Sequence, residues 1–421
     1  MSDTTDRARA LAGGRRGYSV DGGLMGRLMA AHAPDRVFRM LQDRVKTGTL
    51  TLTLPDGSSR TFGGETPGPD AEIVVHSWRT LSRFLLGGGL GFSQAYIDGD
   101  WDSPAPNKIV EVTALNRHAM EDSLTGNPLV RAWNDLRNLI RANTRSGSRR
   151  NIAYHYDLGN EFYAAWLDET MTYSSALFTA PDQALAEAQR AKYRSLLDLM
   201  DVKPGDHVLE IGCGWGGFAD LAAKERGARV TGITLSQEQY DYASRRIHRA
   251  GLADQVDFAL RDYRDVAERF DHVASIEMFE AVGERYWPAY FDKVHDVLKP
   301  GGRAGLQIIS IEDALFDEYR RGVDFIQAYI FPGGMLPSPA ALRAQTDRAG
   351  LVWQDCVSFA RSYADTLAEW RRRFQAAFDQ GRLPTGFDDT FRRIWTYYLS
   401  YCEGGFRGGS IDVHQIRLAR P

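Results

Sequence analysis

A glycine-rich turn between a short apolar strand and a helix is the feature that most restricts the fold of this chain. The expected strand covers residues 207–211, the turn covers 212–217, and helical spacing resumes at Phe218. Further strands are predicted at 229–234, 256–260, 272–276 and 303–311, with helical stretches between them at 218–225, 236–250 and 284–298. This alternation is typical of a parallel α/β sheet, which binds ligands at the carboxyl ends of its strands.

The glycines of the turn satisfy the G-x-G-x-x-G pattern at Gly212, Gly214 and Gly217, which by itself is a weak signal for a dinucleotide site. Such a site also needs an acidic residue at the end of the second strand to bind the ribose hydroxyls. That strand ends at Thr234 without an acid, whereas Glu210 lies at the end of the first strand. The pattern therefore favours an S-adenosylmethionine site, with the methionine ammonium near Glu210, over a nicotinamide dehydrogenase.

Composition excludes several other classes. The 421 residues are 43% hydrophobic and 25% charged, which is ordinary for a globular protein and excludes a wholly disordered one. The formal net charge of −4 argues against a general polyanion binder, so we expect no nucleic acid partner. The three cysteines are far apart and the histidines lack metal-ligand spacing, so no metal is predicted.

The chain contains no stretch of about 18 uncharged apolar residues, so any contact with lipid is expected to be peripheral. We expect four parts along the chain: a disordered leader (1–20), a small α+β domain (21–125), a basic helix or linker (126–150) and an α/β domain (151–421). The basic segment carries Arg137, Arg141 and Arg145 at intervals of four, on one face of a predicted helix. Such a face suits contact with lipid phosphates.

Several spaced motifs together carry a family resemblance. They lie at residues 208–217, 232–236, 262–265, 279–283 and 329–332. In this respect the chain resembles the cyclopropane-fatty-acyl-phospholipid synthase family over roughly residues 70–420. The resemblance implies a Rossmann-like class I methyltransferase domain that uses S-adenosylmethionine to add a methyl carbon to the cis double bond of acyl chains. It also implies that the helical insertion at 312–337 and the C-terminal helices enclose the acyl chain.

The resemblance assigns the cofactor site residue by residue. The matching positions are a cofactor lid at Tyr173 and Ser174, the methionine cradle at Gly212 and Gly214, the ribose region at Thr234, Ser236 and Gln239, the adenine pocket at Asp262 and Tyr263, and Ile276 beside the sulfonium. An aromatic face and a carboxylate suit an adenine ring with its exocyclic amine.

The proton-accepting site departs from the family pattern. The family is thought to use a bound bicarbonate, held by a Cys, Glu, His and Tyr set and a backbone amide. Glu280 and Tyr363 match that set, but Ser175 stands at the cysteine position and Gln307 at the histidine position, and Ala281 follows the glutamate. Whether bicarbonate still binds is left open by these changes.

A changed base predicts a changed product, because the carbon that loses the proton decides what forms. Residues 276–283 and 321–327 look closest to the unsaturated-fatty-acid methyltransferase branch, so we expect a methyl- or methylene-branched chain rather than a ring. The resemblance further implies phospholipid acyl chains at a bilayer as substrate, a cytoplasmic location at the inner membrane surface, a homodimer and a downstream reductase or oxidase. The alternatives are a ring-forming cyclopropane synthase, a methyltransferase of soluble small molecules, and a lipid-binding protein that has lost activity.

Overall fold

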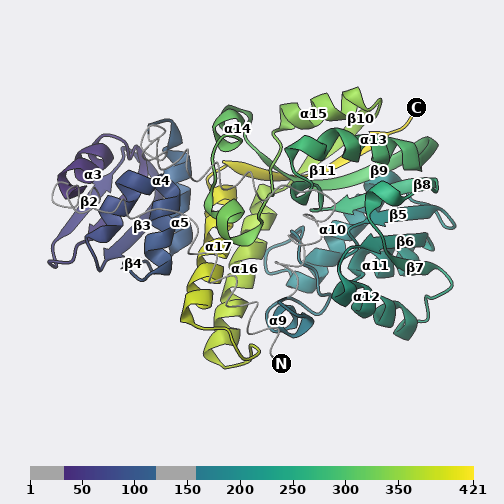
Figure 1. The fold of residues 1–421 in the computed structure, drawn as a ribbon, viewed down its shortest axis with the longest axis horizontal. Helices are drawn as coiled ribbons and strands as arrows, with labels where there is room; N and C mark the ends of the chain where they lie inside the picture. The colour runs from purple at the N-terminus through teal and green to yellow at the C-terminus, as the bar shows by residue number, and fades with distance from the viewer. Residues whose placement is uncertain (1–32, 120–157) are drawn as a thin grey trace. The chain divides into compact units, whose positions relative to one another are not determined.

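The computed structural model describes residues 33–119 and 158–421 (Figure 1). The chain separates into two compact units: within the described ranges, the first comprises 33–119, 317–332 and 370–411, and the second comprises 158–316, 333–369 and 412–421. The predicted leader and the basic segment with Arg137, Arg141 and Arg145 lie outside the described residues. The predicted domain boundaries therefore stay predictions.

The second unit is built on a seven-stranded sheet with the order β10-β11-β9-β8-β5-β6-β7 (Figure 1). Its strands are β5 (His207–Ile211), β6 (Arg229–Thr234), β7 (Val256–Leu260), β8 (Phe270–Ile276), β9 (Leu298–Ile311), β10 (Val352–Ser358) and β11 (Ile411–Ala419). The five strands from β5 to β9 pair in parallel, whereas β10 and β11 pair antiparallel. The parallel α/β fold predicted from the sequence is confirmed, while β10 and β11 were not predicted.

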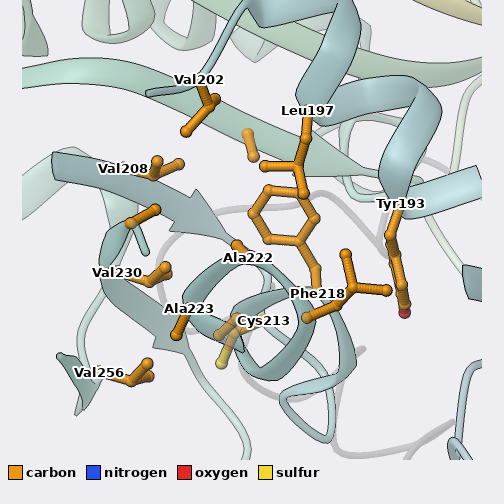
Figure 2. Close-up of a cluster of buried hydrophobic side chains, with 14 of the residues drawn as sticks. Tyr193, Leu197, Val202, Val208, Cys213, Phe218, Ala222, Ala223, Val230 and Val256 are labelled. Carbon is orange, nitrogen blue, oxygen red and sulfur yellow. The ribbon is translucent and has the colours of Figure 1, made fainter. Parts of the chain in front are cut away.

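Helices cover both faces of this sheet, because neighbouring strand residues point to opposite sides. Val208 of β5 belongs to a buried cluster with residues of α10, α11 and α12, as Figure 2 shows for Leu197 and Phe218. Leu209, the next residue, belongs to a second buried cluster with residues of α13 and α15. The helices are α10 (Leu185–Met200), α11 (Gly217–Arg226), α12 (Gln237–Arg249), α13 (Trp287–Val297) and α15 (Pro339–Arg348). The result is three layers with an apolar core on each side of the sheet.

Local sequence signals explain where the helices around the ligand edge begin. Ser236 caps α12, because its hydroxyl accepts a hydrogen bond from the Gln239 N–H at 3.3 Å. The helix predicted at 284–298 begins only at Trp287, because residues 284–286 form the 3₁₀ turn η5 (Glu284–Tyr286) and proline follows at the first turn of α13. The shorter elements here are α9 (Asn160–Ala164), η3 (Tyr263–Asp265) and η4 (Phe279–Ala281).

The first unit contains a four-stranded sheet with the order β2-β1-β3-β4. Its strands are β1 (Thr47–Thr53), β2 (Ser59–Gly63), β3 (Thr66–Val75) and β4 (Trp101–Asp102). β1 and β2 form a hairpin, since they pair antiparallel across the turn at Asp56. Its helices are α3 (Ala33–Gln42), α4 (Arg79–Ile97), α5 (Pro106–Leu115) and α17 (Asp389–Arg407), with the π-helical turn η6 (Ile326–Ile330).

Two helices, α14 (Asp313–Tyr319) and α16 (Ala360–Asp379), have residues in both units. The predicted insertion at 312–337 thus contains α14 and η6. Among the described residues, no helix has both the length and the apolar character that a bilayer crossing requires.

Candidate active site

A pocket opens in the second unit at the carboxyl ends of β5, β6 and β8, where the glycine turn follows β5. Of the cofactor residues predicted from the sequence, all but Ser236 line it; they are Tyr173, Ser174, Glu210, Gly212, Gly214, Thr234, Gln239, Asp262, Tyr263 and Ile276. The pocket thus lies at the edge of the sheet where a parallel α/β fold binds ligands.

The glycine turn provides a cradle with exposed backbone. Gly212 and Gly214 have φ angles of +83° and +50°, in the left-handed region that favours glycine. A Cβ atom on Gly212 would lie 2.9 Å from the Met278 side chain, whereas one on Gly214 would have no heavy atom within 4 Å. Because Gly214 lines the pocket, its missing side chain leaves room for close approach of a ligand to the backbone.

Glu210 supplies a buried carboxylate beside this cradle. It is 3% exposed, and its Oε2 atom has no hydrogen-bond partner among the described residues. Burial raises the pKa of Glu210 well above the usual range, while the positive charges of Lys192 and Arg246 act in the opposite direction. A buried carboxylate oxygen without a partner is suited to an ammonium group, so the site fits the methionine end of S-adenosylmethionine.

The expected adenine region is partly engaged within the protein. Asp262 is buried, and Arg264 donates from its side chain to Oδ1 at 2.8 Å and to Oδ2 at 2.6 Å. Oδ1 also accepts the Arg264 N–H at 3.0 Å. The neighbouring Tyr263 ring meets Tyr290 edge-on at 5.5 Å between ring centroids, which holds Tyr263 in the pocket wall.

The expected ribose region divides into a pocket part and a capping part. Thr234 donates its hydroxyl to Gln239 Oε1 at 2.8 Å, and both residues line the pocket. Ser236 is outside the pocket wall and uses its hydroxyl to cap α12. A ribose contact from Ser236 stays a prediction.

A cluster of donors surrounds Glu277, a residue to which the sequence analysis assigned no role. Its Oε1 atom accepts the Ser175 N–H at 2.8 Å and the Gln307 side-chain amide at 2.7 Å. Its Oε2 atom accepts the Tyr363 hydroxyl at 2.5 Å. The three residues predicted to lie around Glu280 therefore do converge, but on the carboxylate of Glu277.

Glu280, the glutamate that matches the family set, has its own hydrogen-bond partner. Its Oε1 atom accepts the backbone N–H of Ile309 at 2.6 Å, and its Oε2 atom has no hydrogen-bond partner among the described residues. The reason is geometric: Glu277 directly follows β8, whereas Glu280 lies three residues further on, in the turn η4. Glu277 also lines the cofactor pocket, so the pocket and the donor cluster meet at this side chain.

The donors to Glu277 are held in place by further hydrogen bonds. The Ser175 hydroxyl donates to the Ala176 carbonyl at 2.9 Å, which leaves the backbone N–H of Ser175 as the group that binds the carboxylate. Gln415 donates to the side-chain oxygen of Gln307 at 3.0 Å and accepts the Ser195 hydroxyl at 2.7 Å. With its oxygen bound in this way, the Gln307 amide presents its NH₂ group to Glu277.

Burial and charge separate the two glutamates. Burial, together with the negative charge of Glu277, raises the pKa of Glu280 to about 8. Burial also leaves the pKa of Glu277 above its ordinary value, although Lys192 and the three hydrogen-bond donors act against this shift. At neutral pH, Glu280 holds its proton, and Glu277 has the partners that stabilise a carboxylate.

Lys192 is a fully buried cation close to both sites. Its Nζ atom donates to the Ser174 hydroxyl at 2.6 Å and lies 4.3 Å from the centre of the Tyr193 ring. Burial lowers the pKa of Lys192 to about 7, while the charges of Glu277, Asp168 and Glu210 raise it. The lysine therefore offsets part of the negative charge that the buried carboxylates bring into this region.

Comparison with known proteins decides the family. The family model described as mycolic acid cyclopropane synthetase matches residues 143–416. The chain belongs to this family. Members methylate or cyclopropanate lipid double bonds with S-adenosylmethionine. The chain is an S-adenosylmethionine-dependent C-methyltransferase, as the sequence predicts.

Two curated relatives align along most of this methyltransferase. The tuberculostearic acid methyltransferase UfaA1 of Mycobacterium tuberculosis is 40% identical, over 91% of this chain and 90% of the relative. The cyclopropane-fatty-acyl-phospholipid synthase of Escherichia coli is 35% identical, over 83% of this chain and 88% of the relative. The relatives therefore include both a methyltransferase and a ring-forming enzyme by name.

Solved structures agree with this assignment. Mycolic acid cyclopropane synthase CmaA1, complexed with SAH and CTAB, is 30% identical with a TM-score of 0.60, and the match covers 64% of this chain and 98% of that chain. The cyclopropane synthase MmaA2 from Mycobacterium tuberculosis gives a TM-score of 0.60 at 29% identity with the same coverage. The Rossmann-like methyltransferase fold is thereby confirmed.

Sequence reasoning missed three residues of this methyltransferase site. Glu277 carried a usable signal, since it is an acidic residue directly after a strand at the ligand edge of a parallel sheet. Lys192 falls on the buried face of α10 together with Ala188 and Leu196. A lysine in line with buried apolar residues indicates a functional or paired charge, because lysine is rarely buried otherwise. Gln415 acts through Gln307 from β11, a strand that was not predicted, so its place in the site had no sequence signal.

The described residues contain no group of three or more His, Cys, Asp or Glu side chains arranged to hold a metal ion. The three cysteines are free thiols: Cys213 is buried, Cys402 is half-buried and Cys356 is exposed.

Proposed function

We propose that this enzyme transfers the methyl group of S-adenosylmethionine to the cis double bond of unsaturated phospholipid acyl chains and forms a methyl- or methylene-branched chain without a ring. The observation that carries the proposal is the junction of the cofactor pocket with the Glu277 cluster, at the position where the family set is altered. The names of the relatives support a fatty acyl substrate.

The pocket residues position the methyl donor, which supplies an electrophilic methyl group on a sulfonium. Glu210 would bind its ammonium, Gly212 and Gly214 its methionine backbone, and Asp262 its adenine amine. An alkene is a weak nucleophile, so holding it against the methyl group in a site that excludes water is the main contribution of the protein.

Methyl transfer to the alkene forms one bond and breaks one. The π pair of the alkene forms a bond to the methyl carbon, the carbon–sulfur bond breaks, and its pair stays on sulfur to give S-adenosylhomocysteine. The second alkene carbon is left as a carbocation. Loss of one proton from carbon to a base, with the C–H pair forming a new carbon–carbon bond, gives a neutral product.

The carbon that loses the proton decides the product. Loss from the new methyl group beside the cation closes a cyclopropane ring. Loss from a neighbouring chain carbon gives a methyl-branched alkene, and a hydride shift followed by loss from the methyl group gives a methylene branch. The backbone N–H of Ser175 and the side chain of Gln307 bind the carboxylate of Glu277, and neither residue lines the cofactor pocket. The Gln307 departure would therefore act on proton removal rather than on methyl donation.

The test is methyl transfer from S-adenosylmethionine labelled with ¹³C in the methyl group into phospholipid vesicles, followed by mass spectrometry and NMR of the released fatty acids. We expect signals of an alkene methyl or an exocyclic methylene carbon. A cyclopropane ring as the main product would contradict the proposal. Transfer only to soluble small molecules would favour the corresponding alternative, and failure to bind S-adenosylhomocysteine by calorimetry would favour a lipid-binding protein.

A glycine pair provides the matched control for this test. Gly214→Val introduces a side chain at a φ of +50° in the cradle, and Gly251→Val does so at +68° outside the pocket wall; neither Cβ would meet an atom within 4 Å. Both variants carry comparable backbone strain. We expect Gly214→Val to lose at least 10-fold in affinity for S-adenosylhomocysteine and Gly251→Val to bind like the wild type.

The oligomeric state, the location and the following enzyme are also part of the proposed function. The enzyme would work as a homodimer on acyl chains at the inner membrane surface, from the cytoplasm. An alkene-bearing branched product is two electrons more oxidised than a saturated branched chain. A separate reductase would therefore act on it next, or an oxidase if the double bond is elaborated instead.

A further inference from the structure

The family resemblance implies a bicarbonate ion as the proton acceptor, and the structure shows where the corresponding donors are. Ser175 and Gln307 stand at the cysteine and histidine positions of the family set, and Tyr363 at the tyrosine position. All three donate to one acceptor, the carboxylate of Glu277, at 2.8, 2.7 and 2.5 Å. The acceptor for this donor set is therefore part of the protein chain.

A carboxylate and a bicarbonate ion present the same face to such donors. Each has two oxygens on a planar carbon and accepts hydrogen bonds in that plane. Both oxygens of Glu277 are used, since Oε1 accepts two hydrogen bonds and Oε2 accepts one. A bicarbonate ion in this cluster would have to displace the side chain from all three donors.

Charge also opposes a second anion here. The carboxylate of Glu277 lies close enough to Glu280 to contribute to the raised pKa of that carboxyl. A further anion among the same donors would be repelled by Glu277 in the same way, because like charges repel strongly in a buried site. The residues present therefore do not fit a bicarbonate ion.

The backbone at Glu277 is held in an unusual conformation that aims the side chain. Glu277 has a φ of +50°, in the left-handed region that is strained for a residue other than glycine. Its N–H donates to the Gln307 carbonyl at 2.8 Å, which ties this position to β9. Glu277 is thus bound to Gln307 twice, through its carboxylate and through its backbone N–H. Glu277 also lines the cofactor pocket.

We propose that the Glu277 carboxylate is the proton acceptor of the reaction and replaces bicarbonate, an inference that rests on the proposed function. In this step a C–H bond next to the carbocation breaks and its electron pair forms the new carbon–carbon double bond. The proton binds a Glu277 oxygen and converts the carboxylate to a carboxylic acid. Release of the proton to water after the product leaves restores the carboxylate.

The experiment compares methyl transfer to phospholipid vesicles in decarbonated buffer under argon with the same assay at rising bicarbonate concentrations. The wild type is expected to change less than 2-fold. Glu277→Gly removes the carboxylate at a φ that glycine adopts freely and leaves Ser175, Gln307 and Tyr363 as open donors. We expect it to lose at least 100-fold in rate and to regain at least 10-fold on addition of bicarbonate, with saturation.

Glu277→Gln is the matched variant, because it keeps the volume and still fills the donor cluster but cannot take up the proton. It is expected to lose at least 100-fold without rescue by bicarbonate. Calorimetric binding of S-adenosylhomocysteine, within 3-fold of the wild type for both variants, shows that each is folded and loads cofactor.

The outcomes separate this inference from the proposed function. Lipid methylation by the wild type that requires bicarbonate, or a Glu277→Gln variant that keeps its rate, overturns the inference and leaves the proposed function standing. Lipid methylation that forms a ring without bicarbonate overturns the proposed product while supporting Glu277 as the acceptor. The absence of lipid methylation at every bicarbonate concentration overturns both.

Discussion

At the scale of single residues, two glutamates three positions apart differ in role because their surroundings differ. Glu277 accepts three hydrogen bonds on its carboxylate, whereas Glu280 accepts one backbone N–H and has an oxygen without a partner among the described residues. The first environment stabilises an anion and the second stabilises the protonated acid. Burial raises the pKa of both carboxyl groups, but only Glu277 has Lys192 and three hydrogen-bond donors acting against that shift.

The raised pKa of Glu280 predicts that stability falls as the pH rises. The folded protein keeps this proton up to a pH of about 8, whereas an unfolded glutamate releases it near its ordinary pKa of 4.5. Between these values the unfolded state binds fewer protons, so the free energy of unfolding falls by about 1.4 kcal/mol per pH unit from this group. Glu280→Gln should remove this contribution, measured as a smaller difference between urea unfolding free energies at pH 6 and pH 8.

The control is Glu72→Gln, a change at an exposed position of β3 that should follow the wild type at both pH values. Equal pH dependence in Glu280→Gln and the wild type would show that Glu280 ionises near its ordinary pKa.

The candidate site shows what the sequence predicted and what it left out. The convergence of Ser175, Gln307 and Tyr363 was anticipated, and the structure brings their donors together. Glu277 was given no role, because the family pattern contains one glutamate in this motif and assigns the anion to a bound ion. Only the three-dimensional path of the chain after β8 shows that Glu277 turns into the cluster.

At the scale of elements, strands with regular apolar patterns were predicted well. β5, β6 and β7 have the predicted bounds, and β8 and β9 begin earlier than predicted. β10 was missed because six of its seven residues are exposed. A strand without a buried face lacks the alternation of apolar and polar residues by which strands are predicted. α10 was missed although its apolar residues have helical spacing, because Gln189 and Lys192 interrupt its buried stripe.

The packing of α17 against α5 in the first unit depends on two glycines. A Cβ atom on Gly404 would lie 2.4 Å from the Asn107 carbonyl oxygen, and one on Gly408 would lie 2.4 Å from the Ala114 Cβ atom. Gly404→Val should therefore separate the helices and lower the free energy of unfolding by about 1–3 kcal/mol. Urea or thermal unfolding measures this loss.

Gly89→Ala in α4 is the matched control for this prediction. A Cβ atom on Gly89 would meet no atom within 4 Å, so alanine should leave stability unchanged or raise it by up to about 1 kcal/mol. If Gly404→Val unfolds like the wild type, the close contact between α17 and α5 is not required for stability.

At the scale of the whole molecule, the described chemistry belongs to one of the two units. The pocket residues, the Glu277 cluster and Lys192 all lie in the second unit. An enzyme that acts on acyl chains must also meet a lipid surface, and the net charge of −4 would oppose binding to anionic lipid if it were spread evenly. It is not spread evenly, because the sequence places six arginines and three acidic residues, Glu121, Asp122 and Asp135, between residues 121 and 150.

We predict that this basic segment drives binding to anionic membranes. Arg137, Arg141 and Arg145 would each contribute about 1 kcal/mol near such a surface, so the triple alanine variant should bind vesicles of phosphatidylcholine and phosphatidylglycerol roughly 100-fold more weakly at low salt. Flotation of the full chain with vesicles measures this. Pure phosphatidylcholine vesicles should show little difference, and raised salt should reduce the difference, because screening weakens charge attraction. Equal flotation of the variant and the wild type on anionic vesicles would mean that apolar contacts, rather than these arginines, bring the enzyme to its substrate.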